Sequence, residues 1–385
     1  MPNLTSLHIY QKVFLFYFKY PYFYNTSARR FETLQLKDLL YTFYLPEFLV
    51  FSSVLLSIAE LVSIACSEKI HILQVLLYSF ALILSTFNIS TVVAISIVKR
   101  EYVAFCNDLL LQAELLEKDF AKRVKKWDKL TIILTNFVLA SVTLPFVHAI
   151  FEAYLTVNDK FGHLQYTFAN SICPLNTYFA CKAITFIILT IWHALIAFND
   201  TAVLVASVIN GALVLKMLID SVGKLGRMAP SLHSIRVYQR FCILNKNLES
   251  ISTTLAFLLL SLGFGFTVTC NFVTVRMFAV IRMPFYLFFP MGSLVAMVGI
   301  GILLPYGIAC HELSRKLLVG WRKTLGSKRG SMRFEEKIGK GLRPIGIKVG
   351  SGEFSLFVLK KSTKSTYYVA VMNTTIDALM TKMDK

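Results

Sequence analysis

Polar side chains recur near the C-terminus at the spacing of one helix face. Thr366, Asn373 and Asp377 are separated by seven and four residues, with Ala370 and Met380 on the same stripe. Such side chains can face a water-filled path, and a ring of carboxylates from several copies of a chain favours cations. Two interpretations are open. Asn373 hydrogen-bonds a neighbouring helix inside a bundle, or the stripe lines a pore.

The remaining sequence contains no pattern for making or breaking covalent bonds. "GSGEF" at Gly350 lacks the continuation of a phosphate-binding loop and is typical of a turn, and "HELSR" at His311 lacks the second His of a zinc-binding helix. No Ser-His-Asp or Cys-His arrangement is supported across the chain. We therefore predict that the protein is not an enzyme and uses neither a cofactor nor a metal.

The composition is that of a membrane protein. The chain has 385 residues, of which 56% are hydrophobic and 16% charged, whereas soluble domains are about 25% charged. The net charge of +18 would suggest a nucleic-acid partner in a soluble protein. Here the Lys and Arg residues lie between apolar runs, as they do on the cytoplasmic side of membrane proteins. We expect contact with membrane lipids and no nucleic acid.

Six stretches are long and apolar enough to cross a bilayer: residues 41–66, 72–98, 131–150, 183–215, 251–272 and 285–310. The leader and alternate connections carry thirty Lys and Arg residues, whereas the intervening connections carry five. The positive-inside bias therefore places the N-terminus in the cytoplasm. We expect the aromatic leader "VFLFYFKYPYFY" to lie at the inner membrane interface.

If the C-terminal segment also crosses, the fold is an all-α membrane protein. It then has seven transmembrane helices, a cytoplasmic N-terminus and an extracellular C-terminus. G-protein-coupled receptors have the opposite orientation, so a receptor of that type is an alternative that the charge distribution disfavours. A multipass transporter is the other alternative, although the chain lacks the clear internal repeat that many transporters show.

The segment "TYYVAVMNT", residues 366–374, resembles the C-terminal signature of insect gustatory receptors: Thr-Tyr, five mostly hydrophobic residues, then Gln-Phe. Thr366 and Tyr367 match, whereas Asn373 stands for Gln and Thr374 for Phe. The stretch "RPIGIKVGSGEFSLFVLKKSTKSTYY" is similar to the region before the last helix of gustatory and odorant receptors. In architecture the whole chain resembles the arthropod chemoreceptor superfamily, but in residues only its C-terminal region does.

This resemblance implies a subunit of a ligand-gated, non-selective cation channel. The channel would be a homo- or heterotetramer in the plasma membrane that responds to a small-molecule tastant or, alternatively, an odorant. Subunit contacts would come from residues 216–250 and 311–353. The last helices would line the pore, with Asn373 at the constriction. The pore and gate residues implied are Thr366, Tyr367, Val369, Asn373, Thr374 and Asp377.

Members of that family bind ligands in the outer half of the bundle, where aromatic rings with a few polar groups suit a small organic molecule. The corresponding residues here are Tyr78, Phe146, His148, Trp192, His193, Phe264 and Tyr286. Packing explains the aromatic residues equally well. The two His, like Glu60 and Asp200, need a partner inside a membrane.

We expect one domain over residues 1–385. Residues 1–40 form a cytoplasmic or interfacial leader, 41–310 a six-helix bundle, 311–353 a cytoplasmic connection that anchors the subunits, and 354–385 the pore-lining seventh helix. Cys173 and Cys181 share one loop. They form a disulfide if that loop faces an oxidising compartment, and otherwise remain thiols.

Overall fold

The computed structural model describes residues 4–14, 19–66, 72–118, 129–159, 163–172, 179–279, 281, 283, 285–327, 333–352 and 354–381. Its elements in chain order are α1 (Thr5–Phe14), β1 (Tyr22–Asn25), β2 (Arg30–Thr33), α2 (Leu36–Leu39), a π-helical turn (Leu40–Tyr44), α3 (Leu45–Ala65), α4 (Ile72–Lys118), α5 (Lys129–Asp159), α6 (His163–Ile172), α7 (Phe179–Leu225), α8 (Leu232–Asn247), α9 (Glu249–Arg276), a 3₁₀ turn (Phe285–Leu287), α10 (Phe288–Ser327), α11 (Arg333–Gly341), β3 (Lys348–Ser351), β4 (Phe354–Val358) and α12 (Lys361–Met380). The strands form two separate antiparallel hairpins, β1–β2 and β3–β4.

Among the described residues, six helices are long and apolar enough to cross a membrane: α3 with the turn before it, α4, α5, α7, α9 and α10. They coincide with the six predicted spans, but α4 continues to Lys118 and α10 to Ser327. The extension of α4 buries Phe105, Leu109 and Leu116, which share one helix face. Hydropathy marked only the fully apolar part of each helix, because an amphipathic extension packs with one side and faces water with the other.

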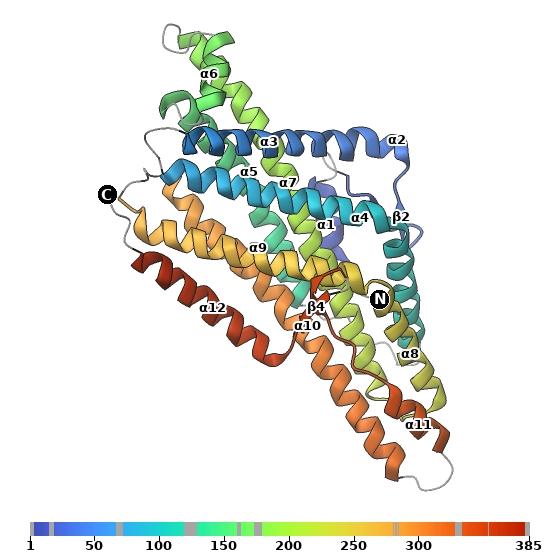
Figure 1. Cartoon of the computed structure of the whole chain (residues 1–385). Coiled ribbons are helices and arrows are strands. Elements are labelled where there is room, and N and C mark those ends of the chain that lie inside the picture. Colours follow the sequence, from blue (N-terminus) through green and yellow to red (C-terminus); the bar gives the residue numbers. More distant parts are fainter. Residues whose placement is uncertain are drawn as a thin grey trace.

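Helix α7 is the centre of the bundle. It packs against α5, α10 and α4 (Figure 1), and most of its apolar length is buried. Small side chains let its neighbours approach closely, and those that are fully buried include Ala202, Ala206 and Ala212. Helix α9, by contrast, fully buries little of its apolar stretch; most of that stretch is half-buried between α4, α10 and α12.

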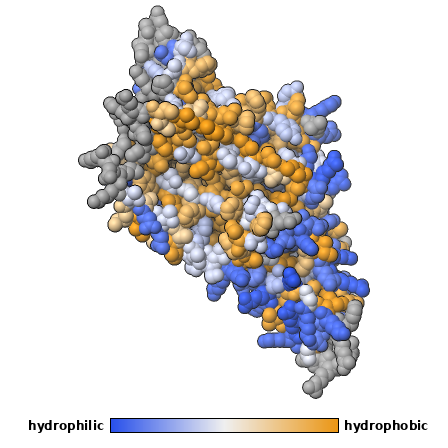
Figure 2. All heavy atoms as spheres, in the orientation of Figure 1, coloured by the Kyte–Doolittle hydropathy of each residue, from blue (hydrophilic) through white to orange (hydrophobic). Residues whose placement is uncertain are grey.

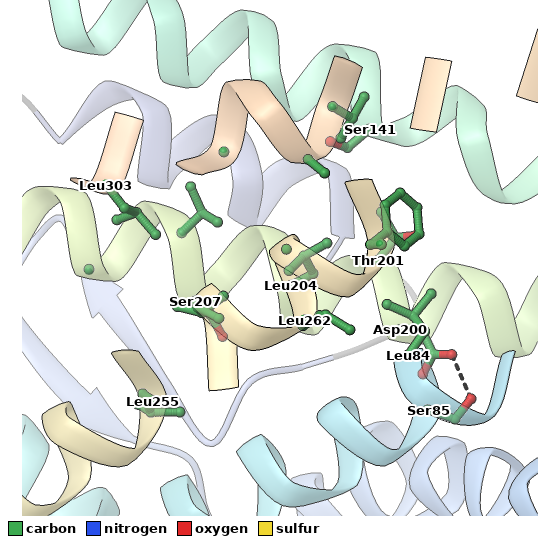
Figure 3. A pocket seen from close by; sticks show the side chains of 18 of the residues that line it. Leu84, Ser85, Ser141, Asp200, Thr201, Leu204, Ser207, Leu255, Leu262 and Leu303 are labelled. Carbon is green, nitrogen blue, oxygen red and sulfur yellow. Dashed lines mark hydrogen bonds between the residues drawn. The ribbon is translucent and has the colours of Figure 1, made fainter. Parts of the chain in front are cut away.

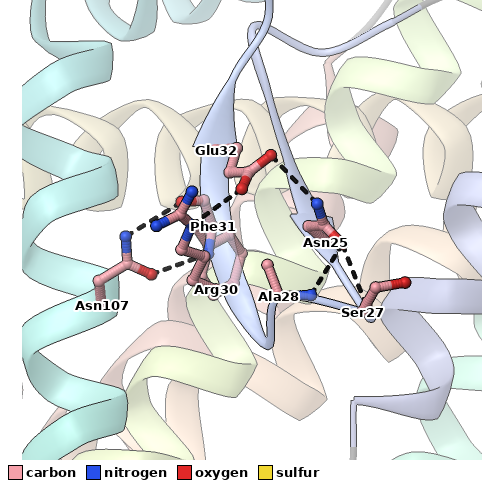
Figure 4. A network of polar contacts seen from close by, with 7 residues as sticks. All are labelled: Asn25, Ser27, Ala28, Arg30, Phe31, Glu32 and Asn107. Carbon is pink, nitrogen blue, oxygen red and sulfur yellow. Dashed lines mark hydrogen bonds and ion pairs between the residues drawn. The ribbon is translucent and has the colours of Figure 1, made fainter.

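The leader folds back into the bundle. Helix α1 packs against α5 and α7, and the Tyr10 hydroxyl donates to the carbonyl oxygen of Ala202 at 3.2 Å. The β1–β2 hairpin is bound to α4 by Asn107, whose side chain accepts from the Phe31 N–H at 2.7 Å and donates to the Phe31 carbonyl at 3.0 Å (Figure 4). The described aromatic side chains of the leader that are buried against protein include Tyr10, Phe14, Tyr20 and Tyr22. The hairpin pairs the backbone polar groups of this segment, which burial requires. The position of the leader at the membrane interface stays a prediction.

The connections sort to two opposite ends of the bundle. At one end, the Tyr238 hydroxyl of α8 donates to the Arg343 carbonyl at 2.9 Å, and Lys348 pairs with Glu249. At the other end, Glu60 of α3 accepts from two N–H groups of α6. Figure 1 shows α8 and α11 far from α6 and from the C-terminal end of α12, and Figure 2 shows hydrophilic residues gathered over the α8 and α11 end. The described parts of the fourth and sixth connections, which the charge count assigns to the same side of the membrane, therefore lie together.

The C-terminal region begins with a hairpin rather than a helix. The seventh helix, expected over 354–385, starts at Lys361 because β3 and β4 precede it. Gly352 has a φ of 58°, and a side chain at Gly350 would overlap the Phe354 backbone, so the turn requires both glycines. Helix α12 has 20 residues, a length of about 30 Å that matches the hydrocarbon thickness of a bilayer.

Candidate functional site

One face of α12 is attached to α9. The Tyr367 hydroxyl donates to the Leu260 carbonyl at 3.3 Å, and the Tyr367 and Phe264 ring centroids lie 6.3 Å apart. Val371, one helical turn on, is 5% exposed. Gly263 makes the close approach feasible, because a Cβ there would lie 2.5 Å from Ile300 Cδ1 and 3.4 Å from the Tyr367 hydroxyl. Helix α12 therefore docks through a narrow strip of its surface.

The other face of α12 is turned away from the chain. Thr366, Asn373, Thr374 and Asp377 are exposed. Beside them lie exposed apolar side chains, namely Val369, Met372 and Ile376. Among the described residues, the Asn373 amide and the Asp377 carboxylate make no side-chain hydrogen bond to another helix. Within the described part of one chain, Asn373 therefore bonds no neighbouring helix, and the pore interpretation stays a prediction.

Such a face is unstable against lipid. Polar groups within a membrane are found facing water or protein rather than lipid; Asn373 lies well inside α12, and Asp377 lies in its last turn. In a bilayer, the Thr366–Asp377 stripe therefore requires water or another chain beside it. The site residues that the sequence predicts on α12 thus fall into two groups: Tyr367 holds the helix, and the other five lie on the exposed face.

A cavity of about 330 Å³ lies within the bundle, between α4, α5, α7, α9 and α10 (Figure 3). This volume is at the lower end of the range for small-molecule sites. On α7 its lining extends from Trp192 to Leu218. Four of the seven predicted ligand residues line it: Tyr78, His148, Trp192 and His193. The elements that bring them together are α4, α5 and α7.

The other three predicted ligand residues lie outside the lining of this cavity. Phe146 is 51% exposed on the outer surface of α5, because it is two residues from His148 and so points about 200° away from it. Phe264 packs against α12. Tyr286 donates its hydroxyl to the Thr274 carbonyl at 2.7 Å. All three have packing roles in this structure.

Two imidazoles share one carboxylate at the wall of the cavity. His193 Nδ1 on α7 lies 2.7 Å from Glu152 Oε2, and His148 Nε2 on α5 lies 3.3 Å from Glu152 Oε1. All three residues line the cavity. Sequence reasoning missed Glu152, although its position four residues after His148 was a usable signal, since such pairs lie on one helix face.

The other buried carboxylates also have partners, as their burial requires. Asp200 is 3% exposed and accepts from Asn88 Nδ2 at 2.7 Å and Ser85 Oγ at 2.9 Å; Figure 3 shows the latter bond beside the cavity. Glu47 accepts from Asn199 Nδ2 at 3.0 Å. Glu60 accepts from the backbone N–H groups of Leu164 at 3.0 Å and Gln165 at 3.1 Å. Glu60 therefore binds the N-terminus of α6, where the helix dipole favours an anion.

The fold is closely matched among solved structures. The insect olfactory receptor OR5 from Machilis hrabei superposes with a TM-score of 0.67 at 10% sequence identity, covering 98% of this chain and 97% of the receptor. The same receptor in complex with eugenol gives 0.64 at 12% identity, covering 97% and 96%. This chain has the insect olfactory receptor fold. No protein-family model and no curated protein sequence matches it.

The shared fold is the one that the sequence resemblance implied. Both chains are covered over nearly their full lengths, so the leader and α12 belong to the shared architecture. Cys181 lies in the first turn of α7, not in the preceding loop, and is disulfide-bonded. Cys173, the partner that the sequence predicts, lies outside the described residues.

Proposed function

We propose that the chain is a subunit of a ligand-gated, non-selective cation channel with a chemosensory role in the plasma membrane. Its N-terminus is cytoplasmic and its C-terminus extracellular, so α12 is a seventh membrane crossing. The observation that carries the proposal is the outward-facing polar stripe of α12. The likeness of the fold to an insect olfactory receptor supports it.

A pore follows from the geometry of α12 when several copies assemble. Four chains arranged around an axis would place four polar stripes against a shared column of water, which removes the contact between Asp377 and lipid. Asn373 would then form the constriction, with Val369 and Ile376 next to it. Thr374 stands where the family signature has Phe, so the closed pore would rely more on these apolar neighbours to exclude water.

The cavity would receive the ligand, a small-molecule tastant or odorant. Its wall and the attachment of α12 share residues. Leu260, Gly263 and Ile300 line the cavity. Leu260 and Gly263 lie against the Tyr367 hydroxyl, and Tyr367 packs against the buried cluster that contains Ile300. A ligand that displaces α9 or α10 at these positions therefore changes the contacts that hold α12 against the bundle. A ligand shifts an equilibrium only through such differential contacts.

Whole-cell recording tests the function directly. Cells that express the chain, alone or with a related subunit, are screened with sugars, bitter compounds and volatiles without added G protein. The proposal expects a cation current that starts with ligand and reverses near 0 mV. Surface expression without current in any combination, or current that depends on a G protein, would contradict it.

An epitope tag tests the topology separately. A tag placed after Lys385 should be stained on intact cells, because an odd number of crossings puts the two termini on opposite sides. A matched tag before Met1 should be stained only after detergent. The reverse pattern would refute the orientation, and detergent-dependent staining of both tags would refute the seventh crossing.

A further inference from the structure

The outer part of the cavity contains a hydrogen-bonding cluster whose chemistry selects a ligand. Glu152 lies between His148 and His193, at 3.3 Å and 2.7 Å from their nearest ring nitrogens. A carboxylate only accepts hydrogen bonds, so each of those nitrogens carries its proton toward Glu152. The remaining nitrogens are His148 Nδ1 and His193 Nε2.

These two nitrogens are unsatisfied. Both are buried, and neither has a hydrogen-bond partner among the described residues. His193 as a whole is 9% exposed. Buried polar atoms in native proteins nearly always have a partner, so two orphan nitrogens on one cavity wall need an explanation. A ligand that binds there supplies one.

The charges around the cluster restrict which ligand fits. With both rings neutral, the two free nitrogens accept hydrogen bonds. With one ring protonated, which neutralises Glu152, one free nitrogen donates and the other accepts. A hydroxyl group matches both states, because it donates one hydrogen bond and accepts others. A methyl ether lacks the donor.

A carboxylate ligand is disfavoured. Glu152 and Asp200 line the cavity, and none of the described residues that line it is Lys or Arg. An anion in this site would be buried beside carboxylates with no fixed positive charge to offset the loss of hydration.

We propose that His148, Glu152 and His193 bind the hydroxyl group of a small, largely apolar alcohol or phenol. This inference rests on the cavity being the ligand site in the proposed function. Tyr78, Trp192 and Phe288 line the same cavity and pack against the apolar part of the ligand, and the Phe288 and His148 ring centroids are 5.2 Å apart. Because both free nitrogens are buried, they reach the ligand through small rotations of the imidazole rings, about a torsion with broad minima, that keep the contacts to Glu152.

Direct binding to the purified full-length chain tests the proposal. The probes are 2-phenylethanol, its methyl ether and phenylacetic acid, which differ at the polar end only. Binding is measured by the concentration-dependent rise in thermal denaturation midpoint. The alcohol should bind about tenfold more tightly than the ether, and the acid should bind more weakly than either. Equal binding of alcohol and ether, tight binding of the acid, or no binding of the alcohol would overturn the proposal.

Two variants test whether the preference for the alcohol over the ether depends on the cluster of His148, Glu152 and His193. His193→Phe keeps a ring but removes the acceptor, and Glu152→Gln replaces one of the two oxygens that face the imidazoles by an NH2 donor. Each should reduce the alcohol-to-ether ratio to within about twofold. Phe146→Leu, on the lipid-facing side of the same helix as His148, should leave the ratio unchanged. An unchanged ratio in both cluster variants would overturn the assignment. If either variant fails to fold, the probe comparison on the unaltered chain still decides.

The outcomes separate this proposal from the channel proposal. Tight binding of the alcohol without any ligand-gated current would refute the channel and leave the hydroxyl site standing. Ligand-gated current with no preference for alcohol over ether would refute the hydroxyl site and leave the channel standing.

Discussion

The Tyr367 hydroxyl lies 3.3 Å from the carbonyl oxygen of Leu260, so the outward-facing helix is held by a residue of the cavity wall. Tyr367 is on α12 and Leu260 on α9. The opposite side of α12 carries the exposed polar stripe. One face of α12 therefore contacts the wall of the cavity, where a ligand would bind, and the opposite face would line the path of the ions.

Tyr367→Phe tests this attachment. The change keeps the ring contact with Phe264 and removes one hydrogen bond, so it should lower the free energy of unfolding by about 1 kcal/mol. The measurement is the thermal denaturation midpoint of the purified chain. Tyr368→Phe, whose hydroxyl makes no hydrogen bond to a described residue, is the matched control. An equal effect of both substitutions would show that the bond to Leu260 contributes nothing.

Asp377→Asn tests the charge at the outer end of the stripe. A carboxylate at the mouth of a pore concentrates cations, so its removal should lower the single-channel conductance and weaken block by divalent cations. The loss should be largest at low salt, because at about 0.1 M the Debye length has already fallen to about 10 Å. Asp377→Glu should conduct like the unaltered chain. Unchanged conductance of the Asn variant at low salt would remove Asp377 from the ion path.

Glu60→Gln tests how α6 is held. The carboxylate of Glu60 accepts from Leu164 and Gln165 at the N-terminus of α6, and losing its charge there should cost about 1–2 kcal/mol. Hydrogen exchange in residues 163–172 should become faster. Asp108→Asn, an exposed acid on α4, should leave exchange in α6 as it was. Slow exchange in the Glu60 variant would mean that α6 is held by other contacts.

Asn107→Ala tests how the β1–β2 hairpin of the leader is attached to α4. The side chain holds both backbone polar groups of Phe31, so its loss should cost about 1–3 kcal/mol and release the β1–β2 hairpin. Trypsin should then cleave faster after Arg29 and Arg30, with Asp108→Asn again as the control. Cleavage at the same rate in both variants would show that the hairpin is held without Asn107.

Hydropathy and charge predicted the parts of this fold that depend on lipid. The six spans and the sorting of their connections follow from apolar length and from Lys and Arg positions, because both respond to the bilayer. The leader could not be predicted in the same way. Its burial depends on Asn107, seventy-six residues beyond Phe31, and single-sequence patterns do not show which distant side chain satisfies a backbone group.

The candidate site was predicted in part for similar reasons. His148 and His193 were chosen because an ionisable group in a membrane needs a partner, and that rule holds, since Glu152 pairs with both. Phe146 was chosen as an aromatic residue at the right depth, but depth does not determine helix face, and it points outward. The polar stripe of α12 was the most reliable signal, because a spacing of seven and four residues defines a face without any knowledge of neighbours.

Cysteine accessibility is the most direct test of a water-filled path along α12. Asn373→Cys and Val371→Cys place thiols two residues apart, one on the exposed face and one at a buried position. A cationic methanethiosulfonate reagent is applied from outside during ligand-evoked current. We predict rapid, irreversible block of the Asn373→Cys current and no change in Val371→Cys or the unaltered chain. Block through Val371→Cys alone, or in neither variant while both carry current, would contradict a pore lined by this face of α12.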